Sequence, residues 1–433
     1  MSDLGHITFE CAFVAGSMTG TSPARELDII VYGASGFVGK LLADYLVKHA
    51  PEGTKIGLGG RSLEKLAATR ADLGTAAADL PLIIADADDA TALKALAQRT
   101  RVVATTVGPY AKYGHTLVHE CASAGTHYVD LTGEVLFHRE SIDANHELAV
   151  STGAKIVHSC GFDSIPSDLG VHVLHEKVTA DGAGELTDTT LVVTALRGGV
   201  SGGTIDSLRN QIDVSKDDAR LRKLAASPYS LSPDRDREPD LGRQSDVSVV
   251  DGKKIDPSLK GWKAPFVMAS YNTRVVRRSN ALREWAYGKK FKYSEVMSVG
   301  SSVVSPVIAG GVAVGLGALV AGLALPPTRF LLDKVLPAPG EGPSESTQKK
   351  GHFTLDVFTT TTTGARYTSR VKAKGDPGYS ATAVMLGESA LSLAKDHKDL
   401  PAATGVLTPS TALGDVLVER LTKAGFEISA RKL

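Results

Sequence analysis

The chain has 433 residues, with 48 basic and 48 acidic side chains and a formal net charge of zero at pH 7. At roughly 150 residues per domain, it is long enough for two or three domains with a full hydrophobic core. The balanced charge argues against a protein that binds nucleic acid by neutralising phosphates. The cysteines at positions 11, 121 and 160 form no spaced pair, which excludes a disulfide framework and a cysteine-based zinc site.

The first residues do not resemble the domain that follows. Residues 1–17 carry Asp3 and Glu10 and lack the basic start of a secretion signal. We expect 1–26 to be a disordered extension, or the true start to be Met18.

Between residues 27 and 158, short apolar runs alternate with segments of helical periodicity. The predicted strands are 27–32, 55–60, 82–85, 102–107, 127–131 and 155–158. Strands that alternate with helices form βαβ units, so a parallel sheet with right-handed crossovers is expected. The sequence therefore predicts an α/β, Rossmann-type domain over 27–170. The tail, 405–433, is a candidate to return to this domain.

The turn after the first strand carries a glycine motif. Gly33 permits a tight turn, Gly36 lets the backbone approach a pyrophosphate, and Gly39 allows close packing of helix on sheet. Backbone N–H groups at the start of the helix would hold the phosphates. An ordinary glycine-rich turn is the alternative, but the strand–turn–helix context favours a dinucleotide. The predicted cofactor-binding residues here are Gly33, Ser35, Gly36, Phe37, Val38 and Gly39.

The end of the second strand indicates which dinucleotide is bound. An NAD site places a carboxylate here to hold the ribose 2′-hydroxyl. This chain has Arg61 and Ser62 instead, with no carboxylate before Glu64. Arg61 can bind a 2′-phosphate with its guanidinium fork and Ser62 can add a hydroxyl, which favours NADPH. Asp86, after the third strand, is predicted either to lie near the adenine or to cap a helix.

Later strand ends add further candidates at the same edge of the sheet. Gly108 and Pro109 bend the chain where a nicotinamide would lie. The sixth strand is followed by candidate substrate-binding residues, Gly161, Phe162, Asp163 and Ser164. Open α/β sheets bind ligands at the carboxyl ends of their strands, so these groups are expected to converge. For each polar residue taken singly, helix capping is the alternative.

A second, mixed α+β domain for substrate binding and dimerisation is predicted over 171–404. Its expected elements are a strand at 186–196, a helix at 202–226, a mobile linker or lid at 227–261, a strand running into a helix at 266–277, an antiparallel hairpin at 353–363 and 366–374, and a helix at 379–395. Arg274, Arg277 and Arg278 form a basic cluster, predicted to be a solvated face or to meet phosphopantetheine or lipid headgroups.

Residues 296–328 form an apolar segment with no charged side chain between Glu295 and Arg329. It holds a run, 308–325, long enough to cross a hydrocarbon core of ~30 Å as a helix. A single span would separate the nucleotide domain from the tail, so peripheral contact with a membrane or lipid is favoured. The alternatives are a buried helical hairpin or a helix at the interface of a homodimer.

Seven motifs carry a family resemblance. They are GASGFVG, GGRS, VGPY, DLTGE, SCGFDSIPSDLG, VKAKGDPGYSATAVM and GVLTPSTALG, in this order along the chain. Together they resemble the saccharopine dehydrogenase-like oxidoreductases, and this Ala- and Gly-rich version is similar to the mycobacterial trans-acting enoyl reductases. The resemblance implies reduction of polyketide intermediates of cell-envelope lipids, on behalf of synthases that lack a working reductase module.

The expected function is therefore an NADPH-dependent reduction of a C=C bond in a polyketide or fatty-acyl thioester. The partner would be a polyketide synthase carrier protein, and the location the cytoplasm, peripheral to the inner face of the plasma membrane. Two alternatives are kept. An amino-acid C–N dehydrogenase of the saccharopine type predicts a small polar pocket with arginine and lysine. A non-catalytic, membrane-associated protein predicts NADP binding without turnover.

The proton donor is predicted among three residues that follow the Gly-Pro bend. These are Tyr110, Tyr113 and His115, of which Tyr113 is favoured. No metal is expected, because the helically spaced histidine pairs, 115 with 119 and 172 with 175, lack a third ligand.

Overall fold

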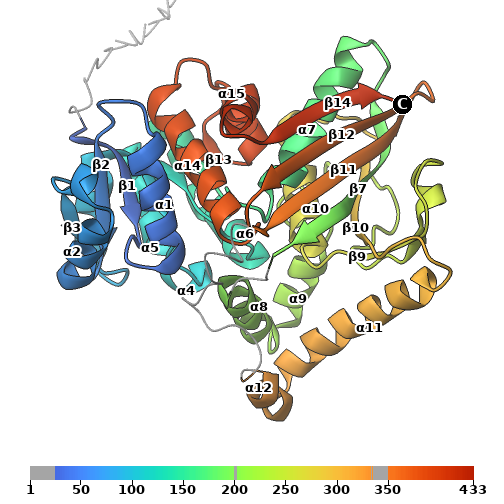
Figure 1. The fold of residues 1–433 in the computed structure, drawn as a ribbon, viewed down its shortest axis with the longest axis horizontal. Coiled ribbons are helices and arrows are strands. Elements are labelled where there is room, and N and C mark those ends of the chain that lie inside the picture. The colour runs from blue at the N-terminus through green and yellow to red at the C-terminus, as the bar shows by residue number, and fades with distance from the viewer. Residues whose placement is uncertain (1–24, 199–201, 333, 335–349) are drawn as a thin grey trace, which may run out of the picture.

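Two seven-stranded sheets lie side by side and organise the protein (Figure 1). The computed structural model describes residues 25–198, 202–332, 334 and 350–433. The arrangement confirms the predicted fold class, a Rossmann-type parallel sheet with a second, mixed α+β part.

The first sheet is parallel and has the order β13-β6-β5-β4-β1-β2-β3. Its strands are β1 (Leu27–Tyr32), β2 (Ile56–Gly60), β3 (Leu82–Ile84), β4 (Thr100–Thr105), β5 (His127–Val129), β6 (Lys155–Val157) and β13 (Gly405–Leu407). The connecting helices are α1 (Phe37–His49), α2 (Leu63–Asp72), α3 (Ala90–Arg99), α5 (His115–Ala124) and α6 (Val135–Thr152). Strand order reverses between β1 and β4, and such a switch point is where open α/β sheets bind ligands.

The second sheet is mixed and has the order β14-β12-β11-β7-β10-β9-β8. Its strands are β7 (Leu186–Arg197), β8 (Val250–Asp251), β9 (Trp262–Pro265), β10 (Lys292–Ser298), β11 (His352–Thr361), β12 (Arg366–Lys374) and β14 (Glu427–Lys432). β7 and β10 run parallel, and the other paired strands are antiparallel. The predicted hairpin is β11 and β12, with Thr360 opposite Arg366 at its closed end.

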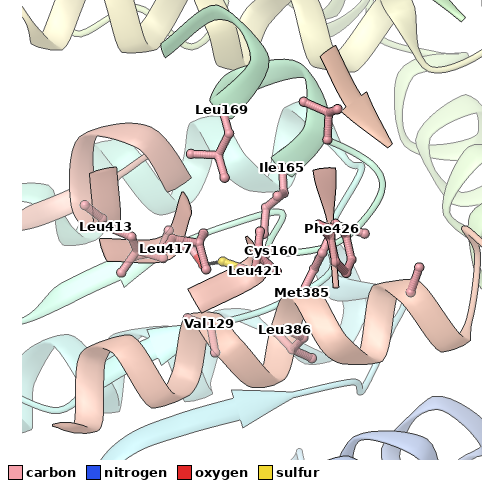
Figure 2. Close-up of a cluster of buried hydrophobic side chains, with 14 of the residues drawn as sticks. Val129, Cys160, Ile165, Leu169, Met385, Leu386, Leu413, Leu417, Leu421 and Phe426 are labelled. Atoms are coloured by element: carbon pink, nitrogen blue, oxygen red, sulfur yellow. Dashed lines mark hydrogen bonds between the residues drawn. The ribbon is translucent and has the colours of Figure 1, made fainter. Parts of the chain in front are cut away.

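Three helices fill the space between the sheets: α7 (Ile165–Ala180), α14 (Ser380–Lys395) and α15 (Pro409–Lys423). Figure 2 shows their apolar side chains meeting around Cys160. Each large side chain buried here contributes about 1.5–3 kcal/mol relative to an exposed one. Because one cluster contains residues of both sheets, the two parts share a core.

The chain crosses between the two parts more often than the predicted boundaries allow. α14 falls within 171–404, yet it packs against α1 and β4 of the nucleotide sheet. Tyr45 of α1 donates a hydrogen bond to Glu388 of α14 at 2.5 Å. The tail divides, since β13 pairs with β6 while β14 pairs with β12.

Residues 1–24 of the predicted extension lie outside the described residues, but its last two residues are anchored. Arg25 donates to the carbonyl oxygens of Ala97, at 3.2 Å, and Ala124. Glu26 accepts a hydrogen bond from Arg99 at 2.9 Å. The prediction of disorder is therefore wrong for Arg25 and Glu26, because both bind to the edge of the nucleotide domain.

The segment 227–261 is packed against the protein and is not a free linker. Its backbone carbonyl groups accept hydrogen bonds from buried arginines of α6 and α10 (Ala269–Leu282). Arg277 binds the carbonyl of Pro228 at 3.2 Å, and Arg278 binds that of Leu231 at 2.6 Å. Arg274 is also buried, and it pairs with Asp246. Both predictions for this basic cluster are wrong, since its charges face inward.

Two further predictions about helices need correction. The expected single helix at 202–226 is two helices, α8 (Gly202–Ser215) and α9 (Ala219–Ala226), because the Asp218 side chain caps a new helix start. The apolar segment forms the end of β10, then α11 (Ser305–Ala324) and α12 (Pro326–Leu332). α11 runs along one side of the molecule (Figure 1) and is mostly exposed, so it is not a core helix of this chain.

Candidate functional site

A cavity of about 860 Å³ opens at the switch point of the parallel sheet and extends to the second sheet. Most of the predicted cofactor-binding residues line it: Gly33, Ser35, Gly36, Phe37, Val38, Arg61, Asp86, Gly108 and Pro109. Tyr110, Tyr113, Phe162 and Asp163 also line it. Gly39, Ser62, His115, Gly161 and Ser164 are not among the lining residues.

The glycine turn has the geometry of a dinucleotide cradle. Gly33 has a φ of 89°, and a Cβ there would lie 2.7 Å from Cγ2 of Val107. A Cβ on Gly39 would lie 2.0 Å from the carbonyl oxygen of Gly33, so α1 packs directly on the turn. Gly36 precedes α1 and supplies no side-chain cap. The backbone N–H groups of the first turn are therefore left for a phosphate, and the site fits the pyrophosphate of a dinucleotide.

The end of β2 separates the roles of two predicted residues. Arg61 is exposed and lines the cavity, where a 2′-phosphate could reach it. The hydroxyl of Ser62 accepts a hydrogen bond from the N–H of Lys65 at 3.3 Å and so caps α2. Asp86 lines the cavity, whereas the cap of α3 is Asp89. The helix-cap alternative for Asp86 is therefore wrong.

Tyr110 is a structural residue of the cavity floor. It is buried, its hydroxyl donates to the carbonyl of Thr105 at 3.2 Å, and it accepts from the N–H of Leu131 at 3.1 Å. Because both hydrogen bonds go to backbone groups of neighbouring strand ends, the hydroxyl is occupied in holding β4 and β5 together.

The other two predicted donors lie in different environments. Tyr113, at the end of α4 (Tyr110–Tyr113), lines the cavity and is partly exposed, with the ammonium of Lys112 4.9 Å from its ring centroid. His115 does not line the cavity. Its Nε2 lies 3.3 Å from Glu140, and its ring packs on Phe137. Tyr113 therefore lies at the candidate site, and His115 does not.

Glu134 orients the segment that carries these tyrosines. Its buried carboxylate accepts the N–H groups of Tyr110 at 2.8 Å and Ala111 at 3.0 Å, which caps α4. It also accepts the hydroxyl of Ser207 on α8 at 2.9 Å. Burial raises the pKa of Glu134, although these hydrogen bonds oppose the shift. One side chain therefore fixes α8, a wall of the second part, to the nucleotide domain.

Of the four residues expected to bind substrate, Phe162 and Asp163 reach the cavity. Burial raises the pKa of Asp163 to about 7, and the nearby charge of Asp130 adds to the shift. Asp163 therefore carries a proton part of the time at neutral pH. Gly161 has a packing role, because a Cβ there would lie 2.7 Å from Leu131. Ser164 is buried and bonds to Asn272 at 3.2 Å.

Sequence reasoning missed Tyr271, a cavity-lining residue of α10. Its hydroxyl lies 3.0 Å from Nδ1 of His138 and contacts the hydroxyl of Ser159. Ser159 in turn donates to the carbonyl of Thr132 at 2.7 Å. Burial raises the pKa of Tyr271 well above its ordinary value, so the phenol keeps its proton. No local pattern marks this tyrosine, because its partners come from elements over 100 residues away.

The buried carboxylate of Asp130 holds Ser159, the hydrogen-bond partner of Tyr271, in place. Asp130 accepts the N–H of Ser159 at 2.9 Å and the hydroxyl of Tyr128 at 3.0 Å. It also lies 2.7 Å from Nδ1 of His158, whose other ring nitrogen lies 2.8 Å from Ser141. The network fixes Ser159, a residue with a positive φ of 65°, against the hydroxyl of Tyr271.

The wall opposite the nucleotide sheet has an apolar part, formed by Leu196, Leu208, Phe266, Val267 and Met268. Polar residues lie beside it: Asp206, Ser207, Gln211, Ser270 and Thr382. Among the described lining residues, the cations are Arg61 and Lys112, both on the nucleotide side. The second-sheet side therefore suits an uncharged, chain-like substrate better than one with several carboxylates.

The glycine turn has the geometry that binds the phosphates of a dinucleotide, and it lies at a cavity lined by both parts of the protein. This arrangement is typical of oxidoreductases that use a nicotinamide dinucleotide. Residues 29–157 match the family described as saccharopine dehydrogenase NADP binding domain. A protein of Mycobacterium tuberculosis provisionally named a trans-acting enoyl reductase is 50% identical over 422 residues, covering 95% of this chain and 99% of that protein. Another from that organism, named trans-acting enoyl reductase, is 48% identical over 421 residues, covering 95% and 100%.

The chain therefore belongs to the trans-acting enoyl reductase family, within the saccharopine dehydrogenase-like oxidoreductases. The fold agrees with this assignment. Apo saccharopine dehydrogenase (L-Glu forming) from Saccharomyces cerevisiae superimposes with a TM-score of 0.51 over 94% of this chain and 100% of that one, at 14% identity. The resemblance that the motifs predicted is confirmed.

Proposed function

We propose that this protein is an NADPH-dependent enoyl reductase that reduces a C=C bond of a polyketide or fatty-acyl thioester. The names of its relatives support the reaction type. The acyl chain would arrive on the carrier protein of a polyketide synthase, and the product would serve cell-envelope lipid synthesis. We place the reaction in the cytoplasm, where NADPH is available.

The observation that carries the proposal is a single cavity with a phosphate-binding turn at one side and an apolar wall at the other. An acyl thioester needs this apolar wall for its chain. A saccharopine-type substrate would need cations for its carboxylates. Among the described residues that line the cavity on the second-sheet side, none is a cation. Burial of polar groups such as Asp163 and Tyr271 costs desolvation free energy. A catalytic role at the cavity would account for this cost, and the non-catalytic alternative does not.

This chain offers separate contacts for each part of the dinucleotide. The glycine turn between Gly33 and Gly39 would hold the pyrophosphate, and Arg61 would bind the 2′-phosphate of NADPH. Gly108 and Pro109 would lie beside the nicotinamide. When bound, NADPH supplies a hydride to the β-carbon of the substrate.

Two groups of this chain would handle the charge that develops on the substrate. Tyr271 retains its proton and is positioned by His138 and Ser159. By turning its one hydroxyl hydrogen from Ser159 to the substrate, it would donate a hydrogen bond to the thioester oxygen as that oxygen becomes negative. Asp163, with a pKa of about 7, can deliver a proton to the α-carbon. Tyr113 is the alternative donor, because it lines the cavity and is partly exposed.

The test is NADPH oxidation by the purified full-length protein. Enoyl thioesters of increasing chain length, free and on a carrier protein, should be reduced, and longer chains should give higher kcat/KM because they bury more apolar surface. Amino acids with NADP should give no turnover. Turnover of an amino acid, with none of any enoyl thioester, would contradict the proposal.

The role of Tyr271 has its own test. Tyr271→Phe should lower kcat about 100-fold, the usual effect of losing one donor to a developing oxyanion, with NADPH binding unchanged. The matched control is Tyr229→Phe, because Tyr229 is a partly buried tyrosine outside the cavity. Equal kcat in the two variants would remove Tyr271 from the mechanism.

A further inference from the structure

The apolar helix α11 is the most exposed hydrophobic feature of the described chain. Of eighteen exposed large hydrophobic side chains, nine lie between residues 303 and 331, so the exposure is concentrated in one segment. Val303 is 96% exposed, Val307 74% and Val314 73%. A contiguous exposed apolar patch marks a surface that another molecule covers.

α11 is apolar around its whole circumference. An 18-residue window has a mean hydropathy of 2.2, yet only 11% of that window is buried in the protein. A helix that docks on a folded partner usually has one apolar stripe and one polar face. α11 has no charged residue on any face, so every side that leaves the protein surface requires an apolar environment.

Both ends of this segment are attached to the same body. At the start of α11, the hydroxyl of Ser305 accepts the N–H of Trp262 at 3.2 Å. Beyond its end, Arg329 of α12 binds both carboxylate oxygens of Asp213 on α8 at 2.8 Å. α11 is long enough to span a bilayer, but ends fixed to one body keep it lying along the surface (Figure 1).

We propose that α11 inserts lengthwise into one leaflet of a phospholipid bilayer and holds the protein on the membrane. A bilayer fits better than a second copy of the chain, because it provides an apolar environment on all free sides of the helix at once. The groups at its two ends also suit the interface: Trp262 at one, and at the other Phe330, 63% exposed, with Lys334 4.4 Å from its ring centroid.

This placement has a consequence for the cavity. α8, to which Arg329 attaches the segment, lines the cavity with Leu208 and Gln211. Insertion of α11 would therefore bring one cavity wall close to the membrane surface, where lipid-like chains are found. The proposal itself does not depend on enoyl reduction, because it rests on α11 and its attachments alone.

The experiment is flotation of the full-length protein with phosphatidylcholine vesicles. The wild-type protein should float with the vesicles and stay bound in 1 M salt, where exposed charge contacts are screened within about 3 Å. The variant Val307→Asp with Val314→Asp should lower the partition coefficient at least about tenfold, because charged side chains enter the hydrocarbon at high cost. The matched control, Val150→Asp with Val247→Asp, makes the same charge change at exposed positions elsewhere and should float as wild type does.

Retained NADPH binding by the α11 variant would show that its loss of flotation is not a loss of fold. Two outcomes would overturn the proposal. A wild-type protein that stays in solution as a dimer, and becomes a monomer in the α11 variant, would assign α11 to a second copy of the chain. A wild-type monomer that does not float would show that α11 needs no lipid.

Discussion

Replacement of Arg61 by aspartate tests the proposal that the site prefers NADPH to NADH. Arg61 is exposed at the cavity wall, and Asp86 and Asp88 line the same region. In Arg61→Asp, a third carboxylate would therefore replace the cation that we propose binds the 2′-phosphate. A hydrogen bond to a charged group contributes about 1.5–3 kcal/mol, which corresponds to roughly a 10- to 150-fold change in Kd. Because Arg61 is exposed, the lower end of this range is expected in physiological salt.

The assay is a titration of the purified protein with each dinucleotide, followed by fluorescence. Arg61→Asp should weaken NADPH binding about tenfold or more and leave the Kd for NADH within about twofold, because NADH has no 2′-phosphate. The effect on NADPH should shrink as salt is raised. Lys65→Asp is the matched control, since Lys65 is exposed on α2 but does not line the cavity. Unchanged affinities for both dinucleotides in Arg61→Asp would refute the assignment.

Three further variants test other parts of the site and its support. Gly39→Ala should abolish dinucleotide binding and lower the free energy of unfolding in urea by about 1–3 kcal/mol, because its Cβ would lie 2.0 Å from the carbonyl oxygen of Gly33. The control Gly310→Ala places its Cβ in open space and should change neither quantity. Asp163→Asn should lower kcat and remove the fall in kcat/KM above pH 7, because only the protonated Asp163 donates and burial raises its pKa to about 7; an unaltered pH profile would exclude it as the acid. Burial also raises the pKa of Glu295 from 4.5 to about 7, so its contribution to stability is present below pH 4.5 and lost by pH 7. The free energy of unfolding in urea, measured at both pH values, should therefore depend on pH by about 3 kcal/mol less in Glu295→Gln than in the wild type.

The nucleotide sheet could be predicted from the sequence because its signals are local. A buried parallel strand is a short apolar run, and β1, for example, was expected and found at 27–32. The glycine turn follows the same logic, since Gly33 and Gly39 act on each other within one turn and helix. Short-range periodicity and backbone sterics suffice for such features.

The parts that sequence reasoning missed depend on contacts between distant segments. Arg278 was expected on a surface, but it binds the carbonyl groups of Leu231 and Val406, which no local pattern reveals. Tyr271 joins the cavity for the same reason, through His138 of another helix. Such residues require the tertiary structure, because their partners are brought together only by the fold.

The transfer of an isotopically labelled hydride tests the central claim most directly. The full-length protein would be supplied with an enoyl thioester in ordinary water and with NADPH that carries deuterium at both C4 positions of the nicotinamide. The product would be analysed by NMR and mass spectrometry. The account predicts deuterium at the β-carbon of the saturated chain and a solvent proton at the α-carbon. A product without deuterium at the β-carbon, or no saturated product with any enoyl thioester, would contradict it.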